Sequence, residues 1–215
     1  MNKRAAAVVA LLTATALALG VLVGSVLNRP SSLSIPADTS AEAGFARDMQ
    51  AHHSQAVELS RLVRDRTDDE DVRILAQDIM LTQQNQAGQM AGWLETWGLP
   101  QSSGREPMAW VAGGHGHAAM TSDDPDAPMG YAAMPGWVSD EDMARLTAAQ
   151  GEEAERLYLQ LMIPHHQGGV EMAQIALDQV QAPQVRDLAQ AIVTAQEAEI
   201  TVLEQMLAER GGPVA

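Results

Sequence analysis

The stretch 47–59, RDMQAHHSQAVEL, places two adjacent histidines three residues after a methionine. The stretch 159–172, LQLMIPHHQGGVEM, repeats this arrangement in a chain that holds six histidines. Shifting the sequence by 113 residues superimposes 49–100 on 162–213 without a gap, with 16 identities in 52 positions. The sequence therefore indicates an internal duplication of one structural unit.

Each copy has the pattern of a helical hairpin, because its apolar residues recur at helical spacing. Pro183 is suited to a helix start, and Gly98 and Gly211 are suited to helix ends. Ser139, followed by three acidic residues, indicates a further capped start. The prediction is an all-α, ferritin-like four-helix bundle. Its parts are a first hairpin over 42–100, a crossover over 101–139 and a second hairpin over 140–213, within one domain over 42–215.

Composition limits the chemistry and the partners. The 215 residues include no cysteine, so disulfides and thiolate metal sites are excluded. The formal charge is −15. Because the three basic residues within 1–29 have no acidic neighbours there, the rest of the chain carries 10 basic and 28 acidic residues. We expect such an acidic body to repel nucleic acid.

The N-terminus has the pattern of an export segment. Lys3 and Arg4 precede an uncharged run over 5–27, which is long enough to cross a bilayer as a helix. The basic flank predicts that everything after Arg29 lies outside the cytoplasm. We favour an uncleaved membrane anchor over 1–29, with a cleaved signal peptide as the alternative and a linker over 30–41.

The paired histidines fall on the apolar face of their predicted helices at 100° per residue, beside the upstream methionines. Glu58 and Glu171 fall on the opposite face. A histidine or methionine on such a face is usually a core residue, but duplication of the whole group favours metal ligation. The predicted bundle ligands are Met49, His52, His53, Met162, His165, His166 and Met172.

The next helix of each hairpin carries polar residues on its own apolar face. These are Gln83 and Gln86 in the first copy, and Gln196 and Glu199 in the second. A buried amide or carboxylate needs a hydrogen-bond partner, and the imidazole N–H groups are the candidates. We predict that Gln83, Gln196 and Glu199 orient the ligating histidines.

Copper fits these donors better than other metals, because thioether sulfur selects Cu(I) and imidazole also suits copper. Zinc rarely uses methionine, and iron in such bundles uses Glu-x-x-His motifs that the sequence does not contain. The crossover adds further candidate ligands on a Gly- and Pro-rich backbone that we expect to be flexible: His115, His117, Met120, Met129 and Met134.

FARDMQAHHSQAVELS, LQLMIPHHQGGVEMAQIAL and LAQAIVTAQEAEITVLEQM resemble the family called domain of unknown function 305 (DUF305) over roughly residues 42–210. The resemblance implies a ferritin-like helical bundle that is usually exported, and some members are described as copper-binding proteins that use Met and His. The motif falls on the second-copy residues named above, Gln196 and Glu199 included. The first copy departs from it at Leu59 and Gln86.

Three functions follow from these expectations. The first is an exported, membrane-tethered copper chaperone or sequestering protein, periplasmic or extracellular, with the metal ion, the membrane, a copper-handling partner or a second copy of the chain as partners. The second is a metal-dependent oxidase or hydrolase with Glu199 as its base. The third is a structural module whose histidines only bond across the core. We favour a binding protein over an enzyme.

Overall fold

The computed structural model describes residues 35–111 and 129–214, and every regular element within them is helical. The long helices are α2 (Ala41–Arg64), α3 (Glu70–Thr96), α6 (Gly151–Gln179) and α7 (Pro183–Glu209). A short helix α5 (Asp140–Ala148) and a 3-10 turn η1 (Gly130–Ala133) lie between α3 and α6. No strand occurs in the described ranges. The all-helical prediction is confirmed.

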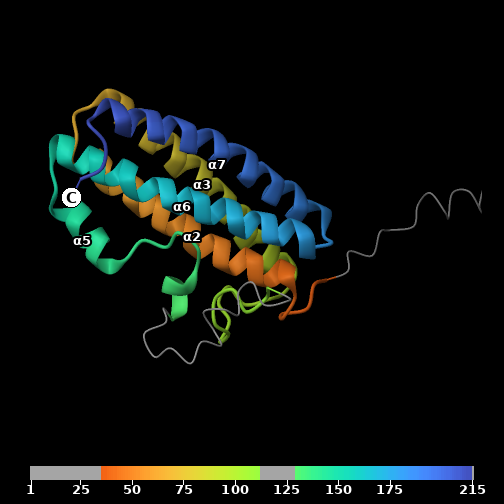
Figure 1. The fold of residues 1–215 in the computed structure, drawn as a ribbon. Coiled ribbons are helices and arrows are strands. Elements are labelled where there is room, and N and C mark those ends of the chain that lie inside the picture. The colour runs from red at the N-terminus through yellow and green to blue at the C-terminus, as the bar shows by residue number, and fades with distance from the viewer. Residues whose placement is uncertain (1–34, 112–128, 215) are drawn as a thin grey trace, which may run out of the picture. The chain divides into compact units, whose positions relative to one another are not determined.

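The four long helices form two hairpins (Figure 1). Helix α2 packs against α3, and α6 packs against α7. The two hairpins meet where α2 packs against α6. Helix α5 contacts both α2 and α6 and lies at one end of the long helices.

The helix ends carry the caps predicted at Ser139, Pro183, Gly98 and Gly211, and a further cap at Asp69. The Ser139 hydroxyl accepts a hydrogen bond from the backbone N–H of Asp142, 3.1 Å away. Asp69 caps α3 in the same way through the Val72 N–H, at 2.9 Å. Pro183 is at the start of α7, and Gly98 and Gly211 follow their helices with positive φ, where glycine is favoured.

One boundary differs from the prediction. The helix that Ser139 caps is α5, which ends at Ala148, and α6 begins separately at Gly151. The chain breaks there because Gly151 has φ +56° and its N–H donates to the Arg66 carbonyl at 2.7 Å. The described ranges therefore contain five α-helices, where the sequence indicated four main ones.

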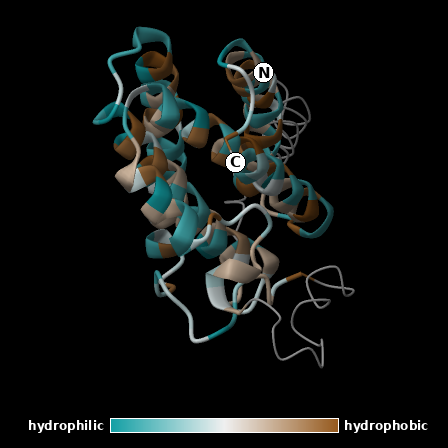
Figure 2. Ribbon diagram, turned by 60° about the vertical axis from the view of Figure 1, so that its left-hand side comes forward, coloured by the Kyte–Doolittle hydropathy of each residue, from teal (hydrophilic) through white to brown (hydrophobic). Residues whose placement is uncertain are grey.

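The interior has two hydrophobic clusters. The Met49 cluster includes Met49, Met90, Met172 and Ile192, and the Leu59 cluster includes Leu59, Ile79, Met162 and Leu203. Every long helix contributes to both clusters. In Figure 2 hydrophobic and hydrophilic residues alternate along these helices, as expected of helices with one buried face.

Within residues 35–111 and 129–214, no helix combines the length and the apolar character needed to cross a membrane. The predicted anchor over 1–29 lies outside the described residues. So do the candidate ligands His115, His117 and Met120.

Candidate metal centre

A layer of polar side chains separates the two hydrophobic clusters. We call it the His layer, and each long helix supplies two of its residues. Glu199 reaches solvent in part, whereas the four imidazole rings have no exposed surface at all. The members of the layer are His52 and His53 on α2, Gln83 and Gln86 on α3, His165 and His166 on α6, and Gln196 and Glu199 on α7.

The two hairpins meet in this layer through stacked imidazoles. The ring centroids of His52 and His165 are 3.8 Å apart, with an interplanar angle of 29°. The rings of each adjacent pair are further apart, at 6.5 Å for His52 and His53 and 6.3 Å for His165 and His166. The structure therefore brings together all four histidines that the sequence pattern predicted.

Three of the four histidines are oriented by an acceptor at Nε2. His53 donates to the Gln86 Oε1 at 2.8 Å, and His166 donates to the Glu199 carboxylate at 2.7 Å. His52 donates to the backbone carbonyl of Pro135 at 3.1 Å. These acceptors require a proton on Nε2, so a ring in its neutral form carries its lone pair on Nδ1.

Several buried polar atoms of the layer have no hydrogen-bond partner within the protein. They are five imidazole nitrogens and the amide groups of Gln83 and Gln196. His165 has neither ring nitrogen paired, and the other three histidines have Nδ1 unpaired. The hydrogen bonds expected from the sequence are thus present for Gln86 and Glu199 but absent for Gln83 and Gln196. Leaving a buried polar atom unpaired costs about 1–3 kcal/mol. A ligand that binds the unpaired imidazole nitrogens would offset this cost.

Burial keeps His52, His53 and His165 neutral. It lowers the pKa of His52 to about 4, against the smaller opposing effect of the Pro135 carbonyl. It lowers the pKa of His53 to about 3, helped by the nearby His52. Burial and the neighbouring rings hold the pKa of His165 well below its usual value. Neutral imidazole is the form that binds metal.

Buried methionines occur on the same helices as the paired histidines. Within the two described ranges, no three side chains of His, Asp or Glu converge so as to hold one metal ion. Met49 and Met162 lie one helical turn before the His pairs, and both are fully buried, as is Met172. These three methionines are the buried sulfur atoms nearest in sequence to the paired histidines.

The crossover methionines are placed differently from one another. Met129 is 79% exposed, as a loop ligand would be. Met134 is buried in the Met49 cluster, in contrast to the flexible position that the sequence indicated. The reason is that residues 134–138 pack against the bundle and bring Met134 with them. Glu58 and Glu171 are exposed, as predicted.

The 134–138 segment is fixed against both hairpins. The Gln55 side-chain amide donates to the Val138 carbonyl at 2.8 Å, and the Val138 N–H donates to the Gln55 Oε1 at 2.9 Å. A Cβ on Gly168 would lie 2.1 Å from the Pro135 carbonyl oxygen. The glycine therefore permits the close approach that places this carbonyl on His52.

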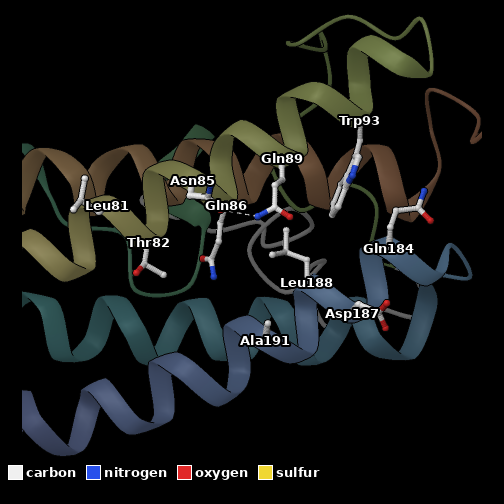
Figure 3. A pocket seen from close by; sticks show the side chains of 10 residues that line it. All are labelled: Leu81, Thr82, Asn85, Gln86, Gln89, Trp93, Gln184, Asp187, Leu188 and Ala191. Carbon is white, nitrogen blue, oxygen red and sulfur yellow. Dashed lines mark hydrogen bonds between the residues drawn. The ribbon is translucent and has the colours of Figure 1, made fainter.

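A groove between α3 and α7 leads from solvent to the His layer (Figure 3). Its volume is about 740 Å³. Trp93 and Gln86 enter it from α3, and Leu188 enters it from α7. Gln86 lines the groove and also accepts from His53, so this side chain links the groove to that imidazole.

Sequence reasoning missed two contacts of the helix α2 that carries His52. The first is the Pro135 carbonyl on His52, for which a backbone acceptor gives no side-chain signal. The second is Asp48, which accepts from the Met108 backbone N–H at 2.6 Å and from the Trp110 indole at 2.8 Å. Asp48 lies four residues before His52, on the buried face of the same helix. A buried carboxylate needs hydrogen-bond donors, and that requirement was the available signal.

The fold and the site define an all-helical protein with a buried layer of paired histidines. The chain belongs to the DUF305 family, a domain of unknown function, which it matches over residues 42–207. None of the curated proteins compared with the chain matches it.

Solved structures support this assignment. A DUF305 protein from Streptomyces coelicolor, described as a candidate secreted protein, is 45% identical, with 83% of this chain and 99% of that one covered and a TM-score of 0.72. A DUF305 fragment from Deinococcus radiodurans is 34% identical, with coverages of 79% and 96% and a TM-score of 0.62. CopM in its Cu(I)-bound form is 20% identical, with coverages of 79% and 96% and a TM-score of 0.57. The likeness to CopM shows a shared fold.

Proposed function

We propose that this protein is an exported copper-binding protein that holds the ion in the His layer, between its two hairpins. The observation that carries the proposal is the set of five fully buried imidazole nitrogens without a partner in the protein. The rings are already oriented through Nε2, which leaves Nδ1 available on three of them. Such hydrogen bonds typically fix the tautomer of ligating histidines.

The ligands would come from His52, His53, His165 and His166, with sulfur from Met49, Met162 and Met172. Neutral imidazole and thioether are soft or borderline donors, and together they favour copper as Cu(I) over zinc or iron. CopM, which shares the fold, has been solved with Cu(I), with Cu(II) and with silver. That likeness is consistent with a copper site in the present bundle, which we propose to be ferritin-like and built from duplicated hairpins.

Carriage or sequestration fits the buried layer better than catalysis. The four imidazole rings have no exposed surface, so an organic substrate could not touch them. A single ion could reach them from the groove between α3 and α7. The exposed thioether of Met129 suits initial capture, and we extend that role to His115, His117 and Met120 of the same crossover.

The place of action follows from the N-terminal sequence. Lys3 and Arg4 before the uncharged run over 5–27 favour a membrane anchor, with the bundle outside the cytoplasm. The description of the Streptomyces coelicolor relative as a candidate secreted protein supports export. Copper captured there would then pass to a copper-handling partner or stay sequestered.

The test is a Cu(I) titration of the purified full-length chain against a competing chelator. We expect the fourfold variant H52N/H53N/H165N/H166N to lose the tight site, with affinity falling by a factor of about 100 or more, since imidazole ligands are removed. The variant H115N/H117N is the matched control and keeps the tight site. Unchanged binding in the fourfold variant would show that the histidines only complete the core.

A further inference from the structure

Gln86 and Glu199 occupy equivalent places but differ in charge. Each lies 33 residues after the histidine that it orients, and each accepts from Nε2, at 2.8 Å from His53 and at 2.7 Å from His166. The amide is neutral, whereas the carboxylate is negative. The two halves of the His layer are therefore alike in shape and unlike in electrostatics.

Apart from Glu199 and the His166 ring bonded to it, the side chains of the layer and the neighbouring methionines are neutral. The thioethers and the Gln83 and Gln196 amides carry no charge. His52 and His53 each give their one N–H to a neutral oxygen, and their remaining nitrogen faces no acceptor. A second proton on either ring would bury an unpaired N–H together with a positive charge.

Glu199 is thus the one charged side chain bonded to these histidines in the described ranges. Its side chain is 23% exposed, whereas His166 is fully buried, so the carboxylate lies between the layer and solvent. Within residues 35–111 and 129–214, no Lys or Arg is paired with it. Its negative charge is therefore available to balance an ion in the layer.

We propose that the His layer is matched in charge to one soft monovalent cation, with Glu199 as the balancing charge and Gln86 as the residue that disfavours divalent ions. This inference rests on the proposed function and adds the residues that would set the preference for a monovalent ion. A monovalent ion beside one carboxylate leaves the layer neutral. A divalent ion leaves one positive charge that no other carboxylate bonded to the layer histidines offsets.

The energetic reason is desolvation. Moving an ion from water into a low-dielectric interior costs several kcal/mol even after relaxation, and a nearby opposite charge offsets that cost only where one exists. Glu199 acts through the His166 ring, because a carboxylate on Nε2–H increases the basicity of the ligating nitrogen. The Gln86 amide orients His53 without adding charge. Glu199 and Gln86 are therefore positioning residues that set specificity.

The test compares Ag(I), a monovalent probe stable in air, with Co(II), a divalent probe whose visible absorption reports its coordination. Both are titrated into the full-length chain. We expect the chain to bind Ag(I) and to bind Co(II) far more weakly. Glu199→Gln should lower the Ag(I) affinity about 10- to 100-fold, the usual range for losing such a partner. Gln86→Glu should raise the Co(II) affinity at least about tenfold and produce a new absorption band.

Two further variants serve as controls. The exchange Q86E/E199Q moves the carboxylate without changing the total charge, so it should keep the preference for Ag(I). It also tests folding, because each substituted residue already occupies the equivalent place in the other hairpin. Glu58→Gln removes an exposed carboxylate of α2 and should change neither affinity.

Equal affinities for Ag(I) and Co(II) in the unaltered chain, or no effect of Glu199→Gln and Gln86→Glu, would overturn the charge-matching inference and leave the proposed function standing. Failure of the unaltered chain to bind Ag(I) or Cu(I) would overturn both. Tight Ag(I) binding that survives loss of all four histidines would also overturn both, since the ion would then lie elsewhere.

Discussion

At the scale of single residues, the buried imidazoles lower the free energy of unfolding of the metal-free protein. Four rings are buried without exposure, and five of their nitrogens have no partner. A core of the same shape built from apolar side chains would avoid that cost. These positions therefore reduce the stability of the metal-free protein, and a ligand that pairs with the nitrogens would restore it.

Acid should unfold the metal-free protein. Burial lowers the folded-state pKa of His52 to about 4 and that of His53 to about 3, from 6.5. The unfolded chain therefore takes up more protons below pH 6.5, and stability is lost as the pH falls from there toward these values. For His52 alone the loss is roughly 3 kcal/mol by pH 4.

The measurement is the free energy of unfolding in urea at several pH values. The variant H53N removes one titrating ring and should give a shallower decline than the unaltered chain. Stability that stays constant from pH 7 to pH 4 would contradict the assignment of these rings as neutral in the fold.

At the scale of elements, the 134–138 segment and α6 are fitted to each other. Gly136 has φ +70°, and a Cβ there would lie 2.3 Å from the Pro164 carbonyl oxygen. Gly168 is its counterpart on α6, since a Cβ there would meet backbone atoms of Pro135 and Gly136. These two glycines allow the backbones of the 134–138 segment and α6 to approach closely. This contact places the Pro135 carbonyl within hydrogen-bond distance of His52. An element without regular secondary structure thus orients one of the four histidines.

Gly168→Ala tests this fit. The added Cβ would meet backbone atoms of Pro135 and Gly136 that cannot rotate away. We expect a loss of about 1–3 kcal/mol from overpacking, despite the gain in helix propensity. Gly88→Ala on α3 is the matched control, because nothing lies within 4 Å of its Cβ position. It should stabilise by up to about 1 kcal/mol. Urea unfolding of both variants is the measurement, and equal effects would contradict this account.

At the scale of the whole bundle, a polar network ties the two hairpins together at one end. Arg210, just after α7, donates to Glu155 of α6 at 3.0 Å and to Asp69 before α3 at 2.8 Å. Thr67 donates to the same Glu155. The network thus joins the turn of the first hairpin to the second hairpin and supplements the packing of α2 on α6.

Arg210→Gln should therefore destabilise the assembly of the hairpins. Glu155 is buried, and losing its cation leaves an uncompensated charge, so we expect a loss of about 2 kcal/mol or more. Arg61→Gln is the control, because its pair with Asp65 is exposed and should contribute less than about 0.5 kcal/mol. Thermal unfolding monitored by circular dichroism distinguishes the two variants. A similar effect of both would show that the network adds no more than a surface pair.

Much of this architecture could be predicted from the sequence, because helices leave periodic and capping signals. The starts at Asp140 and Pro183, the buried His pairs and the exposed Glu58 all follow from such signals. The break at Gly151 could not be placed, since it depends on a hydrogen bond to Arg66 in another hairpin. The burial of Met134 likewise depends on tertiary packing.

The burial of methionine sulfur has a consequence for resistance to oxidants. Met49, Met162 and Met172 have no exposed surface, whereas Met129 is largely exposed. Peroxide converts an accessible thioether to a sulfoxide, which is polar. Outside the cytoplasm, where we place the protein, Met129 would react before the other methionines of residues 35–111 and 129–214. The three buried methionines would remain reduced. The interior of the bundle would therefore stay unmodified after Met129 on its surface is oxidised.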